Sequence, residues 1–302
     1  MGRAVFSLAD LRRWNRTELA LGVAGFPVGH SVSPVMHNAA LAQCPELKDW
    51  RYFAFELRPE ELPEALGLMA RAPFRGLNLT VPLKTVVYEL VRDRDGSAEA
   101  VRAANTLLFE RPGSGAPPTA FSTDGEGLLR ALEEDFGWKP EGTTGSGVLL
   151  LGAGGAGQSA AACLDRAGAN VFWYNRTADK VTRLIGELGL RRTRAVAADE
   201  IKRLRADLII NATSLGLKAG DPAPLELEQT GTAGARLACD MVYNPPQTAF
   251  LEQAGRLGLK TANGLSMLLY QGVRSFEIWT KRQAPVRVMR DVLKEAVYER
   301  TS

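Results

Sequence analysis

Residues 148–157 read Val-Leu-Leu-Leu-Gly-Ala-Gly-Gly-Ala-Gly, an apolar run that leads straight into a glycine-rich turn. Gly152, Gly154 and Gly157 satisfy the pattern G-x-G-x-x-G, and a helical pattern follows from Ser159 to Ala167. In such a turn the first glycine permits the bend, the second lets a pyrophosphate approach the backbone, and the third lets helix and strand pack closely. Amide groups at the helix N-terminus then face the phosphates. The stretch predicts a dinucleotide site; the alternative is a turn that only connects a strand to a helix.

The end of the next predicted strand indicates which dinucleotide binds. Residues 171–174, Val-Phe-Trp-Tyr, are followed by Asn175, Arg176 and Thr177, at the place where an NAD-specific site carries Asp or Glu. A carboxylate would repel a 2′-phosphate, whereas a guanidinium pairs with it in a forked, charge-assisted contact. We therefore expect NADP as the cofactor; the alternative is that Arg176 is a solvated surface side chain.

The composition is ordinary for a globular protein and argues against several classes of partner. Of the 302 residues, 45% are hydrophobic and 24% charged, and the length suffices for two domains. The net charge of +3 is too small to argue for nucleic acid, and basic runs such as residues 191–194 lack interleaved aromatic side chains. Residues 1–14 are too polar and too basic for a signal peptide or a membrane span. We expect a small-molecule substrate as the partner, with neither nucleic acid nor membrane.

The cysteines and histidines indicate a reducing environment and no metal. Cys44, Cys163 and Cys239 are an odd number without C-x-x-C spacing, which argues against a disulfide framework. The only histidines are His30 and His37, and no cluster has the spacing of metal ligands. We therefore expect a cytoplasmic protein without a bound metal.

Short β-rich segments alternate with helical patterns along the whole chain. In the first half the predicted strands are residues 21–26, 52–57, 76–80 and 106–109, and the predicted helices are residues 34–43, 60–70 and 84–92. After the glycine motif the predicted strands are residues 208–210, 237–240 and 259–261, and helices at residues 265–281 and 286–300 close the chain. This alternation predicts the α/β class with two domains.

One expected domain is an N-terminal α/β substrate domain, whose mostly parallel sheet is completed by the C-terminal helices. It comprises residues 1–123 plus 264–302 and carries substrate binding and catalysis. The other is a Rossmann-type NADP-binding domain of residues 124–263. A cofactor on one domain would then meet a substrate on the other.

Two serines precede the first predicted helix of the chain. Ser31 and Ser33 are two residues apart in an extended segment, so both hydroxyls can face one side beside a helix N-terminus, which suits a substrate carboxylate. The alternative is purely structural: Ser33 would be the N-cap and Pro34 the first helical residue.

A strand that ends at Pro82 carries three further polar candidates. Asn78 and Thr80 point to the same face of this strand, because side-chain direction alternates. Lys84 enters the first turn of the next helix, where the helix dipole disfavours a cation. Because a lysine at this position does not stabilise the helix, it suggests a cation with a functional role. Asn105 at a strand start and Asp124 before Gly125 would, alone, be a turn residue and a helix cap.

Taken in order, these motifs resemble those of the shikimate dehydrogenase family. The matching residues are Ser31-x-Ser33-Pro34 with His37-Asn38, Asn78-x-Thr80-x-Pro82-x-Lys84, Ala104-Asn105-Thr106, Thr123-Asp124-Gly125, the Gly152 turn, Asn175-Arg176-Thr177, residues 211–214, residues 240–245, and Asn263-Gly264 leading to Met267 and Gln271. The resemblance covers residues 21–280; Ser122 departs from it, since the family usually has asparagine there. Residues 1–20 have no counterpart, and we interpret them as a short N-terminal extension.

The resemblance implies reversible reduction of 3-dehydroshikimate to shikimate with NADPH, in chorismate and aromatic amino-acid biosynthesis. It makes Lys84 and Asp124 the catalytic pair. The substrate-binding residues that it implies are Ser31, Ser33, Asn78, Thr80, Lys84, Asn105, Asp124, Tyr243 and Gln271. The cofactor-binding residues that it implies are Gly152, Ala153, Gly154, Gly155, Ala156, Asn175, Arg176, Thr177, Lys180, Asn211, Thr213, Ser214, Met241, Gly264 and Met267.

The chemistry of the pair agrees with this implication. Hydride arriving at a carbonyl carbon leaves an alkoxide that needs a proton donor, and an ammonium beside a carboxylate can serve. Whether Lys84 is that donor or mainly an electrostatic residue stays open. Three rivals also remain: a quinate/shikimate dehydrogenase using NAD or NADP, a non-catalytic NADP-sensing protein, and a methylene-folate dehydrogenase of similar plan. The sequence is silent on oligomeric state, so a homodimer is left open.

Overall fold

The computed structural model describes residues 4–140, 147–218, 220–232 and 234–298. The chain divides into two compact units, one of Met1–Thr123 with Gly272–Ser302 and the other of Asp124–Gln271. The first division falls after Thr123, and the second falls inside helix α11 (Leu265–Thr280). Each unit contains one six-stranded sheet among its described residues, and the predicted α/β class is confirmed.

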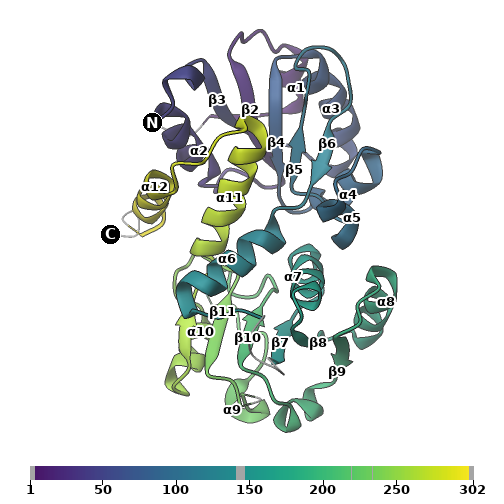
Figure 1. Ribbon diagram of the computed structural model, residues 1–302, viewed down its shortest axis with the longest axis vertical. Coiled ribbons are helices and arrows are strands. Elements are labelled where there is room, and N and C mark those ends of the chain that lie inside the picture. Colours follow the sequence, from purple (N-terminus) through teal and green to yellow (C-terminus); the bar gives the residue numbers. More distant parts are fainter. Residues whose placement is uncertain (1–3, 141–146, 219, 233, 299–302) are drawn as a thin grey trace. The chain divides into compact units, whose positions relative to one another are not determined.

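The sheet of the first unit is mixed, with the strands coloured purple to teal in Figure 1. Its strand order is β1 (Val5–Phe6), β3 (Trp50–Glu56), β2 (Leu19–Gly25), β4 (Phe74–Leu79), β5 (Thr106–Leu108) and β6 (Thr119–Phe121). The first four strands pair in parallel, and β5 is antiparallel to both of its neighbours. The prediction missed β1 and β6. A strand of two residues such as β1 shows no alternation that a sequence pattern can detect.

The two faces of this sheet have different roles. Apolar side chains such as Phe55, Phe74 and Leu77 pack into a core with helices α1 (Leu8–Arg12), α3 (Leu62–Arg71) and α4 (Leu83–Leu90). Side chains that alternate with them, including Tyr52 and Asn78, point to the opposite face. There α2 (Ser33–Ala42) packs beside α12 (Val286–Tyr298). The polar site residues of this unit are therefore carried on the face away from the main core.

Residues 5–14 are part of the first unit, which corrects the interpretation of residues 1–20 as an extension. Strand β1 pairs in parallel with β3, with Val5 opposite Ala54. Ser7 caps α1, whose Leu8 and Leu11 are buried in the core of the unit. The motifs that carry the family resemblance begin at residue 21, so they made no prediction for this segment.

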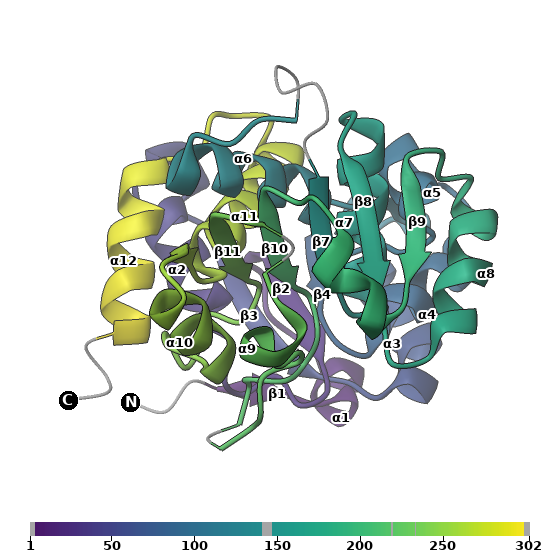
Figure 2. The same ribbon diagram turned by 90° about the horizontal axis from the view of Figure 1, so that it is seen from below.

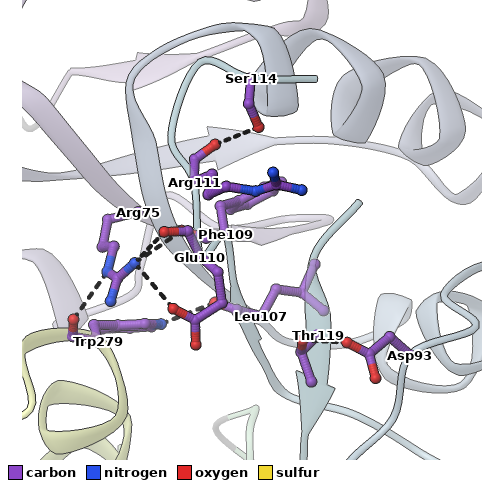
Figure 3. A network of polar contacts seen from close by, with 9 residues as sticks. All are labelled: Arg75, Asp93, Leu107, Phe109, Glu110, Arg111, Ser114, Thr119 and Trp279. Atoms are coloured by element: carbon purple, nitrogen blue, oxygen red, sulfur yellow. Dashed lines mark hydrogen bonds and ion pairs between the residues drawn. The ribbon is translucent and has the colours of Figure 1, made fainter. Parts of the chain in front are cut away.

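The C-terminal half of α11 is fastened to the first unit by Arg75 and Trp279 (Figure 3). Arg75 Nε donates to the Trp279 carbonyl at 3.0 Å, and its Nη1 donates to the Phe109 carbonyl at 3.1 Å. The Trp279 indole donates to the Leu107 carbonyl at 2.8 Å. A Cβ on Gly76 would lie 2.1 Å from the Trp279 Nε1 atom, so only glycine allows the indole to lie flat on β4.

The sheet of the second unit is parallel throughout its described pairs. Its order is β12 (Lys260–Ala262), β11 (Leu237–Asp240), β10 (Leu208–Asn211), β7 (Gly147–Leu151), β8 (Asn170–Tyr174) and β9 (Thr193–Val196). When the strands are numbered 1 to 6 along the chain from β7 and read across the sheet from β9, their order is 3-2-1-4-5-6. This is the order of doubly wound dinucleotide-binding folds. The Rossmann-type prediction is confirmed.

Helices accompany these strands. They are α6 (Asp124–Phe136), α7 (Gly155–Arg166), α8 (Ala178–Leu188), α9 (Leu227–Thr230) and α10 (Ala249–Arg256). Figure 2 shows α8 beside β9 and α10 beside β11. The last two residues of the helix predicted at 286–300 lie outside the described residues. None of the helices in the described part combines the length and the apolar character needed to cross a bilayer.

Candidate functional site

The glycine motif of the second unit takes the geometry that its spacing predicts. Gly152 has a φ of 102°, and a Cβ on it would lie 2.7 Å from the Thr213 methyl group. A Cβ on Gly157 would lie 2.2 Å from the Gly152 carbonyl oxygen, so this glycine lets α7 pack against the end of β7. By contrast, a Cβ on Gly154 or Gly155 would meet nothing within 4 Å. The backbone at the N-terminus of α7 is thus open, as the approach of a phosphate requires.

The loops after β7 and β10 meet where the strand order of this sheet reverses. Strands β7 and β10 are neighbours, and the contact of Gly152 with Thr213 joins the loops that follow them. Ligands of doubly wound folds bind at such a reversal, outside the carboxyl ends of the strands. Ser214 on the second loop is exposed and Thr213 is half-buried. The residues present fit a dinucleotide at this place.

Asn211 shapes this loop from inside the protein. The residue is fully buried, and its Oδ1 accepts from the Thr213 amide at 2.9 Å and the Thr213 hydroxyl at 2.8 Å. Its Nδ2 donates to Asp240 Oδ1 at 2.9 Å, while Thr248 donates to Asp240 Oδ2 at 2.6 Å. Burial raises the pKa of Asp240 above its ordinary value. The buried amide of Asn211 therefore fixes Thr213.

The predicted phosphate-binding residues lie just beyond β8. Asn175 Nδ2 donates to the Thr177 carbonyl at 3.2 Å, which closes the turn into α8. Arg176 is exposed, and Lys180 is half-buried in the first turn of that helix. An exposed Arg176 is compatible with a phosphate contact and with the solvated alternative.

The start of α11 lies against the loop after β11. The Gly264 amide donates to the Val242 carbonyl at 3.1 Å, and a Cβ on Gly264 would lie 2.2 Å from the Met241 carbonyl oxygen. Glycine is therefore required for this close approach. Met267 and Tyr243 are half-buried, so neither is a core residue.

Gln271 lies at the end of the second unit, close to α6. Its Nε2 donates to the Leu268 carbonyl at 2.9 Å, and a Cβ on Gly127 would lie 2.8 Å from the Gln271 amide nitrogen. The residue is half-buried. Gly127 thereby lets the first turn of α6 approach α11 closely.

In the first unit, Asn78 is the centre of a buried polar network. Its Oδ1 accepts from the Tyr52 hydroxyl at 2.8 Å. Its Nδ2 shares its two protons among three acceptors, the Thr106 and Ser275 hydroxyls at 3.0 Å each and the Asn105 carbonyl at 3.1 Å. Asn78 is 5% exposed, and Ser275 and Thr106 are fully buried. The predicted substrate residue is therefore held rigidly from behind by three residues that were not predicted as site residues.

Asn105 is held by Thr123 in the same network. The Thr123 amide donates to Asn105 Oδ1 at 2.8 Å, and Asn105 Nδ2 donates to the Thr123 hydroxyl at 2.9 Å. Asp124 follows directly in the chain, begins α6 and is 4% exposed. The hydrogen bonds between Asn105 and Thr123 thus fix the backbone immediately before Asp124.

The serines and Lys84 stand at the starts of two helices. Ser33 is the first residue of α2 with Val32 as its N-cap, so the structural alternative of a Ser33 cap is wrong. The Ser33 amide donates to the Ser31 hydroxyl at 3.3 Å. Lys84 is half-buried in the first turn of α4, and Thr80 lies just past the end of β4.

Sequence reasoning missed the buried residues that hold the predicted site residues in place. They are Tyr52, Thr106 and Ser275, which form hydrogen bonds to Asn78. Tyr52 could have been found from strand alternation, since it points to the face that also carries Asn78. Ser275 lies four residues after Gln271 on α11, but nothing in the pattern distinguishes it from other small helix residues. Within the described residues, no three His, Cys, Asp or Glu side chains are grouped to hold a metal ion.

Comparisons with known proteins agree across the chain. Three family models match: the shikimate dehydrogenase substrate binding domain at residues 23–107, shikimate/quinate 5-dehydrogenase at residues 138–218, and the shikimate 5′-dehydrogenase C-terminal domain at residues 264–294. A shikimate dehydrogenase (NADP(+)) of Methanopyrus kandleri is 40% identical over 283 residues, which cover 91% of this chain and 94% of the relative.

Two solved structures illustrate the same similarity. Shikimate 5-dehydrogenase of Thermus thermophilus in complex with NADP(H) and shikimate is 36% identical with a TM-score of 0.79, and the match covers 92% of this chain and 99% of that one. Shikimate dehydrogenase of Aquifex aeolicus is 32% identical with a TM-score of 0.81, covering 93% and 99%.

Proposed function

Because the chain belongs to the shikimate dehydrogenase family, we propose that it catalyses the reversible, NADP-dependent reduction of 3-dehydroshikimate to shikimate. The reaction places it in the biosynthesis of chorismate and the aromatic amino acids. The observation that carries the proposal is that the similarity extends over both units, so the substrate half and the cofactor half are matched together. The enzyme is an oxidoreductase acting on a CH–OH group.

NADP is the proposed cofactor of the second unit. The open backbone at Gly154 and Gly155 would hold its pyrophosphate at the N-terminus of α7, and Arg176 would pair with its 2′-phosphate. Thr213 and Ser214 would line the same reversal point, while Met241, Gly264 and Met267 would border the nicotinamide. When bound in its reduced form, the cofactor supplies the hydride.

Residues of the first unit are proposed to bind the substrate. Ser31 and Ser33 would donate hydrogen bonds to its carboxylate, next to the N-terminus of α2. The ring hydroxyls would be bound by polar side chains, namely Asn78, Thr80 and Asn105 with Asp124, Tyr243 and Gln271. Neutral amides and hydroxyls are suited to a polyol, because they both donate and accept hydrogen bonds.

Lys84 and Asp124 are proposed as the catalytic residues. As the carbonyl carbon is reduced, negative charge develops on its oxygen, and the Lys84 ammonium stabilises this charge and gives up a proton. In the reverse direction the neutral amine takes the proton of the alcohol. The Asp124 carboxylate would favour the charged form of Lys84 and accept a hydrogen bond from a ring hydroxyl.

One assay separates this function from its rivals. The purified protein is incubated with shikimate or quinate, each with NADP or NAD, and reduction is followed at the nicotinamide absorbance. We expect the highest kcat/KM with shikimate and NADP. A preference for quinate would identify the quinate/shikimate alternative. No turnover with any pair would overturn the proposal and leave the NADP-sensing and methylene-folate alternatives.

We further propose that the enzyme works in the cytoplasm. Cys44, Cys163 and Cys239 are free thiols, and burial raises the pKa of Cys163 to about 12. Such protonated thiols are compatible with a reducing compartment. Light scattering coupled to size exclusion distinguishes a homodimer from a monomer in solution.

A further inference from the structure

The Tyr52 phenol lies beside Asn78, one of the proposed substrate-binding residues. Tyr52 is 2% exposed, and its hydroxyl donates to Asn78 Oδ1 at 2.8 Å. We propose that Tyr52 is a positioning residue for substrate binding, which orients the Asn78 amide. The inference rests on the proposed function, because Asn78 is assigned to the substrate of that reaction.

The direction of this hydrogen bond follows from a backbone carbonyl. Asn78 Nδ2 donates to the Asn105 carbonyl oxygen at 3.1 Å. A carbonyl only accepts, so the amide cannot be turned round, and Asn78 Oδ1 must face Tyr52. The phenol has one proton, which it gives to Asn78.

This arrangement has a consequence for Asn78. Its Oδ1 accepts from the Tyr52 hydroxyl, which holds the amide in one orientation before the substrate arrives. Without the Tyr52 hydroxyl, Asn78 Oδ1 loses its donor in a buried place.

His37 supports the Tyr52 ring from the side of α2. The two rings are stacked, with centroids 4.4 Å apart and planes 10° from parallel. His37 is fully buried, and neither of its ring nitrogens has a hydrogen-bond partner among the described residues. Trp279 lies beside both rings, with its ring centroid 5.4 Å from that of His37 and 6.0 Å from that of Tyr52. His37 therefore acts on Tyr52 as a flat apolar surface rather than through a hydrogen bond.

The central test is Tyr52→Phe, which retains the ring and removes only the hydroxyl. We expect the KM for shikimate to rise about tenfold, with the KM for NADP changed by less than about twofold. Tyr88→Phe is the matched control, because Tyr88 is 8% exposed in the same unit and is assigned no contact with substrate. It should retain wild-type values. Thermal unfolding of each variant verifies that it is folded.

A second pair of variants tests the ring stack. His37→Phe retains a flat ring and should keep the wild-type KM for shikimate, whereas His37→Ala should raise it. In the Tyr52→Phe background, His37→Ala should add little, because both changes act through the same hydroxyl.

Several outcomes would overturn this role of Tyr52. They are an unchanged KM for shikimate in Tyr52→Phe, an equal rise in the KM for NADP, or fully additive effects of the two changes. Absence of shikimate turnover in the wild-type protein would instead overturn the proposed function and this inference with it. The wild-type assay therefore tells the two failures apart.

Discussion

Asn105 and Thr123 hold each other through two reciprocal hydrogen bonds. The Thr123 amide donates to Asn105 Oδ1 at 2.8 Å, and Asn105 Nδ2 donates to the Thr123 hydroxyl at 2.9 Å. Both residues are buried, at 3% and 2% exposure. Asp124, which carries the proposed catalytic carboxylate, is the next residue in the chain. The pair therefore fixes the backbone directly before it.

Thr123→Val tests this relationship. The substitution keeps the shape of the side chain and the amide bond, but leaves Asn105 Nδ2 without its hydroxyl acceptor. We expect unfolding free energy to fall by about 1 kcal/mol and kcat/KM for shikimate to fall about tenfold. Thr119→Val is the control, because its hydroxyl bonds to Asp93 at the exposed surface. Equal kinetic losses in both variants would contradict a specific role of Thr123.

Lys84→Ala removes the proposed proton donor. We expect kcat to fall by about 10²–10⁴-fold, with a nearly unchanged KM for NADPH, because the ammonium acts at the reacting oxygen. Lys48→Ala, which removes an exposed lysine of the same unit, should leave kcat unchanged. Steady-state kinetics in both reaction directions provide the measurement. Near-normal turnover of Lys84→Ala would exclude Lys84 from catalysis.

Arg176→Ala removes the proposed partner of the 2′-phosphate. The KM for NADP should rise about 10- to 100-fold, while the KM for NAD changes little, because NAD lacks that phosphate. Arg183→Ala is the control, since Arg183 is an exposed residue of α8 paired with Glu187. Equal effects of Arg176→Ala on both cofactors would contradict a contact with the 2′-phosphate, and an unchanged KM for both would support the solvated alternative.

Gly157→Ala tests the packing of the glycine turn. Its Cβ would lie 2.2 Å from the Gly152 carbonyl oxygen, so α7 must shift away from β7. We expect a destabilisation of about 1–3 kcal/mol together with weaker NADP binding. Gly186→Ala is the control in an exposed part of α8, where a Cβ meets nothing within 4 Å. It should stabilise the protein by up to about 1 kcal/mol, through helix propensity. Thermal unfolding and cofactor titration measure both effects.

His37 predicts a specific pH dependence of stability. Burial lowers its pKa from 6.5 to about 3. Between these values the unfolded chain binds a proton that the folded protein does not, so unfolding free energy falls as pH falls below 6.5. The slope for one such group is at most about 1.4 kcal/mol per pH unit. In His37→Phe this contribution is absent, so denaturant titrations at pH 7.5 and 5 should show a smaller loss than in the wild type. The same loss in both proteins would contradict the prediction.

The fold class could be predicted because local pattern and tertiary role coincide along most strands. Residues 148–151 are apolar throughout and form the fully buried strand β7, as a central parallel strand must. The glycines at 152 and 157 predicted a tight turn and a close contact between helix and strand, and the backbone geometry confirms both. Short edge elements such as β1 were missed, because two residues carry no periodicity.

The sequence by itself determined the motifs: which residues can bind an anion, a polyol or a 2′-phosphate, and that Lys84 has no local reason to stand at its helix start. Only the tertiary structure decided how these groups are held. Tyr52, Thr123 and Ser275 orient Asn78 and Asn105 from segments far apart in the chain. A hydrogen bond across such a distance leaves no pattern in sequence, because its direction depends on where folding brings each single proton and lone pair.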